Sequence, residues 1–232
     1  MLDLAQFEWL SFDCYGTLID WESGILGYLQ PLLEAKSRFA SDQEVLNLYS
    51  ELEPRQQTGP YRTYREVLSA VVRDVGRELR FPVTPSDAAG LADSIRDWEP
   101  FPDTVEALRR LQSRYKLAIL SNIDDDLFAY SAAKLQVPFD SVLTAQRLRS
   151  YKPSAENFRA LLRRLGVERE RLLHVAESLY HDIAPAKSLG IATVWVNRRQ
   201  GRAAAASKLA RVQPDLEVRD LDELAVKAVS PA

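Results

Sequence analysis

Polar residues that can take part in catalysis follow four apolar stretches of the sequence. They are Asp13 after residues 7–12, Ser121 and Asn122 after 117–120, Lys152 after 141–144, and Glu177 and Asp182 after 172–176. A carboxylate can act as a covalent nucleophile, a lysine ammonium can stabilise its charge, and a second acid can accept a proton. If the stretches are parallel strands, their carboxyl ends meet at one edge of a sheet, where α/β proteins bind ligands. The four sets together therefore predict one catalytic site.

The segment from Asp13 to Thr17 reads as a tight turn after the first strand. Gly16 can adopt a positive φ or let a substrate approach the backbone closely. Thr17 offers a hydroxyl and a backbone N–H group near the carboxylate. An alternative is that Asp13 only caps the helix that follows.

Composition argues against several other classes of protein. The 232 residues include 30 basic and 33 acidic ones, and this balance favours neither nucleic acid nor an anionic membrane as a partner. The locally basic stretch 202–211 is interpreted as a solvated helix face. One cysteine and two histidines argue against a disulfide, a cysteine-rich zinc site or a histidine-rich metal centre. No signal peptide or membrane-spanning stretch stands out, so a cytoplasmic protein is expected, with a homodimer as one possible assembly.

Residues 21–98 show helical periodicity and no convincing strand. Ser41 with Glu44 three residues later forms a capping-box pattern, and Pro85 suits the first turn of another helix. From Pro100 onward, helices alternate with short apolar strands, a pattern typical of a parallel sheet with helices on both faces. We therefore expect a Rossmann-like, doubly wound α/β core, formed by residues 1–19 and 99–232, with an inserted all-helical cap over 20–98.

The segments FDCYGTL, ILSN, YKP and AESLYHD resemble the four motifs of the haloacid dehalogenase superfamily. The resemblance spans nearly the whole chain, including a helical cap between the first and second motifs. It implies that Asp13 is the nucleophile, that Ser121 binds the anionic group of the substrate and that Lys152 stabilises negative charge. It also implies that Glu177 and Asp182 are the acids of the fourth motif.

Position 15 separates two branches of this superfamily. Its phosphatases carry D-x-D, in which the second aspartate protonates the leaving alcohol, whereas this chain has Tyr15. Tyrosine, with an ordinary pKa of about 10, is a poor acid at neutral pH. The D-x-Y-G-T pattern resembles (S)-2-haloacid dehalogenases, whose leaving halide needs no proton.

That branch implies a displacement on a small anionic 2-haloalkanoate, with no cofactor. Asp13 attacks C2, and Asp182 activates the water that cleaves the aspartyl ester. Ser121, with Thr17 and Asn122, binds the substrate carboxylate, and Tyr15 packs on the substrate or lines the halide pocket. The resemblance also implies a cap arginine for the halide. The candidates for it are Arg55, the best positional match, and its rivals Arg62 and Arg65.

The fourth motif departs from the dehalogenase pattern S-x-N-x-x-D. Glu177 stands at the serine position and Leu179 at the asparagine position, so AESLYHD is closer to the phosphatase pattern. Asp13, Glu177 and Asp182 are therefore the ligands expected if Mg²⁺ binds, and a Mg²⁺-dependent small-molecule phosphatase is the alternative function. A non-catalytic binding protein, or a hydrolase that opens a strained ring at C2 of an amino acid, also stays open.

Overall fold

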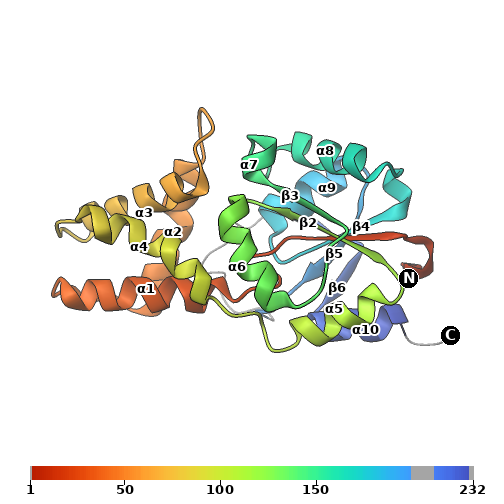
Figure 1. Ribbon diagram of the computed structural model, residues 1–232, viewed down its shortest axis with the longest axis horizontal. Coiled ribbons are helices and arrows are strands. Elements are labelled where there is room, and N and C mark those ends of the chain that lie inside the picture. The colour runs from red at the N-terminus through yellow and green to blue at the C-terminus, as the bar shows by residue number, and fades with distance from the viewer. Residues whose placement is uncertain (1, 200–211, 230–232) are drawn as a thin grey trace.

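The computed structural model describes residues 2–199 and 212–229, and its core is a parallel sheet of six strands (Figure 1). The strands, in sheet order, are β3 Ser141–Thr144, β2 Lys116–Ser121, β1 Trp9–Phe12, β4 Leu172–Ala176, β5 Ala192–Val196 and β6 Leu216–Val218. All neighbouring pairs are parallel. The expected Rossmann-like α/β fold is confirmed, and β1 and β4, which end on the candidate catalytic acids, lie side by side at the centre.

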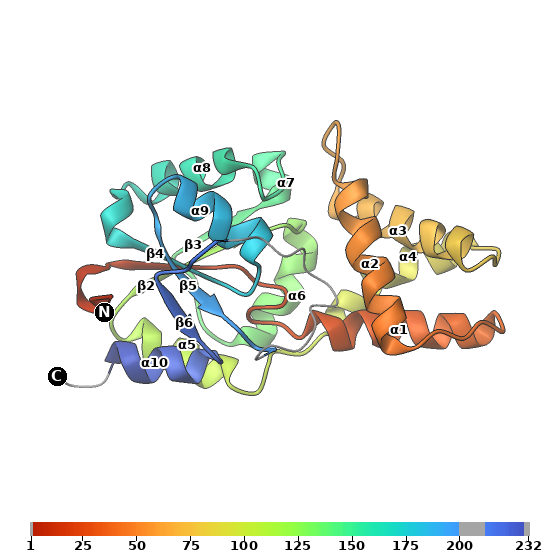
Figure 2. The same cartoon turned by 180° about the vertical axis from the view of Figure 1, so that it is seen from behind.

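Helices cover both faces of this sheet, as Figures 1 and 2 show from opposite sides. The core helices are α5 Thr104–Gln112, α6 Asp125–Leu135, α7 Ala145–Leu148, α8 Ala155–Leu165, α9 Ala184–Ser188 and α10 Leu221–Val229. Helices α8 and α9 pack on one face with Phe158, Leu161 and Ala186, and α5 and α10 pack together on the other. Helices α7 and α10 and strand β6 had no counterpart in the sequence prediction.

Four helices lie between β1 and the core helix α5, and they stand together beside the core in Figure 1. They are α1 Trp21–Ala35, α2 Asp42–Gln56, α3 Tyr64–Glu78 and α4 Pro85–Ser94. The capping box of Ser41 and Glu44 is confirmed, as is Pro85 in the first turn of its helix. We propose that residues 20–98 form a cap on a core made of residues 1–19 and 99–232.

The two segments that join cap and core run next to each other. The Asp20 N–H donates to the Glu99 carbonyl over 2.9 Å. A second connection lies at the start of α3, where the buried Asp124 carboxylate accepts the backbone N–H groups of Tyr64 and Arg65, each over 3.0 Å. A carboxylate at a helix N-terminus satisfies donors that have no partner within the helix. Asp124 therefore attaches the cap to the core by capping one of its helices.

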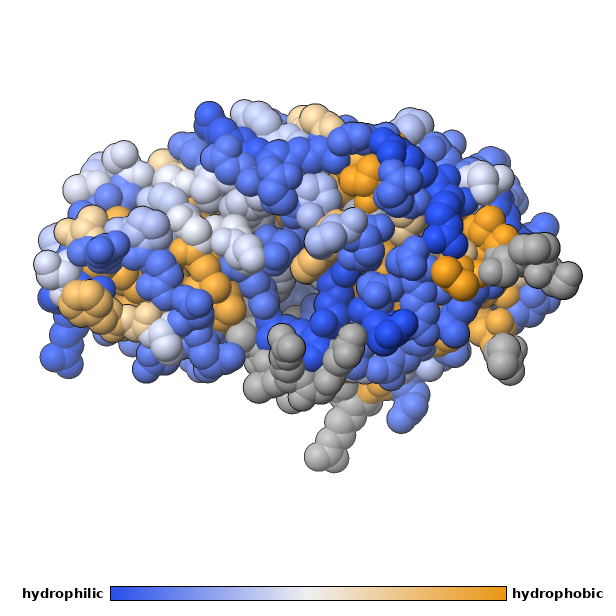
Figure 3. Space-filling model, turned by 90° about the horizontal axis from the view of Figure 1, so that it is seen from below, coloured by the Kyte–Doolittle hydropathy of each residue, from blue (hydrophilic) through white to orange (hydrophobic). Residues whose placement is uncertain are grey.

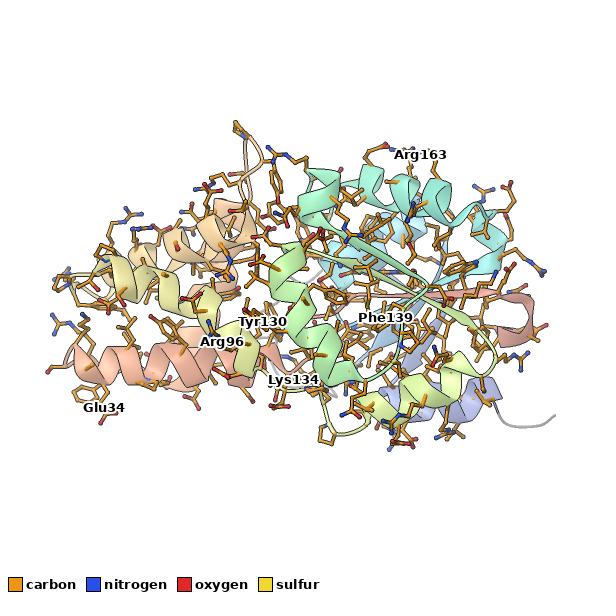
Figure 4. The ribbon with its side chains drawn as sticks, viewed as in Figure 1. Glu34, Arg96, Tyr130, Lys134, Phe139 and Arg163 are labelled. Atoms are coloured by element: carbon orange, nitrogen blue, oxygen red, sulfur yellow. The ribbon has the colours of Figure 1, made fainter. Side chains whose placement is uncertain are left out.

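The last turn of the cap packs against α6. Figure 4 shows Arg96 beside Tyr130, and the guanidinium carbon lies 5.8 Å from the centre of the ring. Trp98, which follows this turn, meets Tyr15 edge-on with ring centres 5.8 Å apart. The turn after β1 is thus in contact with the end of the cap.

The surface seen in Figure 3 is mainly hydrophilic, with hydrophobic residues reaching it in separate patches. None of the helices in residues 2–199 and 212–229 has the length and apolar character that a bilayer-spanning segment needs. The basic stretch 202–211 lies outside the described residues.

Close packing of α1 on Trp98 gives a stability prediction. A Cβ atom at Gly24 would lie 2.4 Å from the buried Trp98 ring, whereas a Cβ at Gly27, on the same helix, would meet no heavy atom within 4 Å. Overpacking costs about 1–3 kcal/mol, and Gly-to-Ala at an open helix position stabilises by about 0.5–1 kcal/mol. In urea denaturation, Gly24→Ala should lower the free energy of unfolding and Gly27→Ala should raise it. Equal stabilities would contradict this packing.

Candidate active site

A buried lysine joins the two aspartates that sequence analysis placed at different strand ends. The Lys152 Nζ atom lies 2.8 Å from Asp13 Oδ1 and 2.6 Å from Asp182 Oδ1, and it donates to the Leu120 carbonyl over 2.9 Å. Only 2% of Lys152 is exposed. Residues that are 139 and 30 positions apart in the sequence from this lysine thus share one ammonium group. We refer to Asp13, Lys152 and Asp182 as the charged triad.

The protonation of the charged triad follows from burial and mutual attraction. Burial raises the pKa of Asp13 above its ordinary value, against the opposing charge of Lys152. For Lys152, burial alone would lower the pKa, but the two carboxylates outweigh it and raise it, so the ammonium keeps its proton. Burial would likewise raise the pKa of Asp182, but Lys152 and a hydrogen bond from His174 hold it below the ordinary value. Asp182 is therefore the more readily ionised aspartate.

The turn after β1 fixes the Asp13 carboxylate. The Asp13 N–H continues the pairing with β4 by donating to the Val175 carbonyl over 3.1 Å. Gly16 has φ +90°, a conformation that favours glycine, as the sequence led us to expect. The turn brings the Thr17 hydroxyl to 2.8 Å from Asp13 Oδ2, and that hydroxyl accepts the Glu177 N–H over 2.9 Å. Thr17 is fully buried beneath the carboxylate, so its hydroxyl orients Asp13.

The Asn122 side chain forms hydrogen bonds with the loop that carries Lys152. Its Nδ2 donates to the Lys152 carbonyl over 3.0 Å, and its Oδ1 accepts the Lys152 N–H over 2.7 Å. This pair of bonds orders the loop that inserts the ammonium between the two aspartates. Asn122 borders the cavity, but its amide acts on the lysine backbone.

Tyr15 is held with its hydroxyl against α6. The hydroxyl lies 2.8 Å from Ser131 Oγ, and burial raises the pKa of Tyr15 well above its ordinary value. A phenol in this environment keeps its proton at neutral pH, and its hydroxyl is already hydrogen-bonded. Position 15 therefore lacks the acid that would protonate an alcohol leaving group.

A small cavity of about 50 Å³ borders the charged triad. Its lining from the core is Asp13, Tyr15, Ser121, Asn122, Lys152, Glu177, Ser178, His181 and Asp182, and from the cap region Trp21, Glu53 and Tyr64. The Ser121 hydroxyl is buried, and no residue in the described part of the chain forms a hydrogen bond with it. A donor without a protein partner at the wall of a cavity is available to a ligand.

The three cap arginines considered for the halide lie outside this lining. The Arg55 side chain is 64% exposed and pairs with Glu51. Arg62 bonds to Gln56 within the cap. Arg65 pairs with Asp93 and Asp126 across the junction of cap and core. The helical phase of α2 turns Arg55 to solvent and Glu53, two residues earlier, toward the cavity, where the Tyr64 hydroxyl donates to it over 3.2 Å.

Two further polar residues, which sequence analysis did not single out, lie under Asp182. His174 Nε2 is 3.0 Å from Asp182 Oδ1, and His174 Nδ1 is 2.8 Å from Ser11 Oγ. Ser11 and His174 are register partners in β1 and β4, and both are fully buried. The signal was present in the sequence, since each interrupts an apolar strand with a polar side chain. Only the pairing of β1 with β4 makes the two residues neighbours.

The donor set does not suit Mg²⁺ as the phosphatase alternative requires. Among the described residues, no group of three acidic, histidine or cysteine side chains is placed to hold a metal ion. The space between Asp13 and Asp182 is taken by the Lys152 ammonium, which already neutralises them. Mg²⁺ prefers an oxygen-rich set of ligands, and the nearest charged partner of both aspartates here is an ammonium group.

Known proteins that resemble this chain over most of its length include haloacid dehalogenases. (S)-2-haloacid dehalogenase 4A of Burkholderia cepacia is 29% identical over 198 residues, covering 81% of this chain and 82% of that protein. A glyceraldehyde 3-phosphate phosphatase of Methanocaldococcus jannaschii is 33% identical over only 103 residues, or 42% of this chain and 44% of that protein. The similarity to haloacid dehalogenases that the motifs indicated is thus confirmed.

The fold has a close counterpart among solved structures. L-2-haloacid dehalogenase from Xanthobacter autotrophicus, with chloropropionic acid covalently bound, superposes with a TM-score of 0.80, covering 97% of this chain and all of that one at 20% identity. At that identity the likeness concerns the fold alone. A sequence model of the haloacid dehalogenase-like hydrolases matches residues 8–190. Because that match covers most of the chain, this protein belongs to the haloacid dehalogenase-like hydrolase family.

Proposed function

We propose that this protein hydrolyses the carbon–halogen bond of short (S)-2-haloalkanoates through an aspartyl-ester intermediate. The observation that carries the proposal is the geometry at position 15. Lys152 and Thr17 position Asp13 as a nucleophile. The Tyr15 hydroxyl is hydrogen-bonded to Ser131 and cannot serve as an acid. A nucleophile without a partner acid suits a leaving group that departs as an anion. The similarity to (S)-2-haloacid dehalogenases supports the same choice.

In the first step, an oxygen of Asp13 attacks C2 of the substrate from the side opposite the halogen. A C–O bond forms as the carbon–halogen bond breaks, and the halide leaves with the bonding electrons. Lys152 keeps Asp13 ionised and oriented, and Thr17 holds its second oxygen. The buried Ser121 hydroxyl donates to the substrate carboxylate, and Tyr15 forms part of the apolar wall.

In the second step, water attacks the carbonyl carbon of the Asp13 ester. Asp182 accepts the proton of that water, because it is ionised and borders the same cavity. The ester C–O bond breaks, the 2-hydroxy acid takes up a proton as it leaves, and Asp13 is restored with one oxygen from water. The net reaction consumes one water and releases one halide and one proton.

The halide site assigned to Arg55 is not part of this proposal, because that side chain is exposed and paired with Glu51. Trp21 and Tyr64 contribute aromatic surface to the cavity, and we propose that the halide leaves along this cap-facing wall. We further propose that the enzyme needs no cofactor and works in the cytoplasm. A homodimer is the assembly we would test first.

One specific observation favours the alternative function, a Mg²⁺-dependent phosphatase. Glu177 lies in the cavity lining together with Asp13 and Asp182. The partial match to a glyceraldehyde 3-phosphate phosphatase points the same way. The unsuitable donor set and the engaged Tyr15 hydroxyl weigh against it.

Replacement of the nucleophile is the first test. Asp13→Asn should abolish chloride release from (S)-2-chloropropionate, since loss of a covalent nucleophile typically lowers the rate by several powers of ten, on the order of 10⁴-fold or more. Asp222→Asn, which removes a surface carboxylate paired with Arg110, serves as the control. Chloride release and circular dichroism are measured for both. An Asp13→Asn enzyme that keeps about a tenth of the wild-type rate would rule out nucleophilic catalysis.

The buried hydroxyl in the cavity gives a prediction about substrate binding. Ser121→Ala should raise KM about 10- to 100-fold, as expected from loss of a hydrogen bond to a charged group, with a folded enzyme. Ser141→Ala is the matched control, because the Ser141 hydroxyl is also buried and without a hydrogen-bond partner in the described part of the chain, but lies outside the cavity lining. Steady-state kinetics compare the two variants. An equal KM for the two variants would show that Ser121 does not bind the substrate.

Metal dependence distinguishes the two functions. A divalent cation on Asp13 would withdraw charge from the nucleophile, whereas phosphoryl transfer needs a metal to neutralise the phosphate. Chloride release from (S)-2-chloropropionate should therefore be unchanged by EDTA or added Mg²⁺. Phosphate release from p-nitrophenyl phosphate is measured under the same conditions. Phosphate release that Mg²⁺ stimulates, without chloride release, would establish the phosphatase instead.

A further inference from the structure

A chain of three buried polar side chains runs beneath the cavity, from Ser11 through His174 to Asp182. The exposed fractions are 0%, 0% and 1%. The distances are 2.8 Å between Ser11 Oγ and His174 Nδ1, and 3.0 Å between His174 Nε2 and Asp182 Oδ1. Phe158 packs edge-on against the imidazole, with ring centres 5.1 Å apart. The ring is thus fixed at both nitrogens and by packing.

The chemistry of these groups sets the direction of the hydrogen bonds. An ionised carboxylate only accepts, so Nε2 of His174 must carry the hydrogen that bonds to Asp182. In the neutral ring, Nδ1 then accepts the hydrogen of the Ser11 hydroxyl. The Asp182 carboxylate therefore selects the tautomer of His174, and the Ser11 hydroxyl supplies a hydrogen to the remaining ring nitrogen.

Both hydrogen bonds to Asp182 go to the same oxygen. Lys152 and His174 each contact Oδ1, and no hydrogen bond to Oδ2 occurs within residues 2–199 and 212–229. Lys152 divides its three donors among Asp13, Asp182 and the Leu120 carbonyl. The second contact, from His174, limits rotation of the Asp182 carboxylate. This leaves Oδ2 for a water molecule in the cavity that Asp182 lines.

We propose that His174, held by Ser11, is a positioning residue that orients Asp182 for hydrolysis of the aspartyl ester. The inference rests on the proposed function, because it assigns His174 to the second step of that reaction. His174 is not itself a lining residue of the cavity, and its side-chain hydrogen bonds go to Asp182 and Ser11, not to Asp13, so displacement of the halide should not depend on it. Its loss should slow ester hydrolysis and spare ester formation.

The test separates the two steps. Enzyme is mixed with (S)-2-chloropropionate, quenched at intervals and analysed by intact mass for the covalent ester. In His174→Leu, ester decay should slow about 10-fold or more, within the range by which outer-sphere positioning residues affect activity, while ester formation stays within about threefold of wild type. The ester should then accumulate, and kcat should fall while kcat/KM is retained.

A matched variant restores the donor. His174→Gln can donate to Asp182 through its amide and accept from Ser11, so ester decay should recover toward the wild-type rate. Ser11→Ala keeps the imidazole but removes its partner at Nδ1, and it should accumulate ester to a smaller extent. If His174→Leu fails to fold, these two variants decide the question.

Three outcomes overturn the inference. The first is ester decay at the wild-type rate in both His174→Leu and Ser11→Ala, with folding verified by circular dichroism. The second is an equal loss in ester formation and decay, which indicates a general structural defect. The third is a wild-type enzyme that forms no ester and releases no chloride, which overturns the proposed function and this inference with it.

Discussion

The site depends on the ion pairs that a single buried ammonium makes with two aspartates. Removing one partner of a buried ion pair leaves an uncompensated charge and costs about 3–5 kcal/mol, so Lys152 must be held in place. The Asn122 side chain does this by forming two hydrogen bonds with the Lys152 backbone. The Leu120 carbonyl, at the end of β2, accepts a hydrogen bond from the ammonium itself. Three strand ends therefore meet on one nitrogen atom. The same ammonium opposes the effect of burial on the pKa of both carboxylates, one for each chemical step of the proposed reaction.

The kind of leaving group that the site accepts depends on how Tyr15 is packed as well as on its being a tyrosine. Tyr15 could in principle turn its hydroxyl toward the substrate, but Ser131 of α6 binds that hydroxyl and Trp98 lies against its ring. Contacts from α6 and from the end of the cap thus hold the Tyr15 hydroxyl away from the substrate. What remains at position 15 is an aromatic wall. Chemistry at this site must therefore manage without proton donation from that position.

The cap gives the cavity a different character from the one the sequence suggested. Helix α2 presents Glu53, with Tyr64 of α3 bonded to it, while Arg55 faces solvent. The cap is joined to the core through Asp124, which accepts two N–H groups at the start of α3. Because Tyr64 is one of those donors, the contact that attaches the cap also positions part of the cavity wall. The shape of the cavity wall and the placement of the cap are physically linked through this residue.

The amino-acid sequence alone determined the α/β class, the helical block that follows the first strand, and the placement of Asp13, Ser121 and Asp182 near strand ends. These follow from local periodicity and short motifs, which need no knowledge of distant contacts. Lys152 was expected directly after the third strand, but helix α7 separates it from β3. Tertiary structure decided which side chains meet. Thr17 and Asn122 were expected at the substrate, but their polar groups are bonded to Asp13 and to the Lys152 backbone. The phase of helix α2 decided that the Arg55 side chain faces solvent. The register of β1 against β4 decided that Ser11 pairs with His174. Side-chain direction and strand register arise from packing between segments far apart in the chain, and no local pattern encodes them.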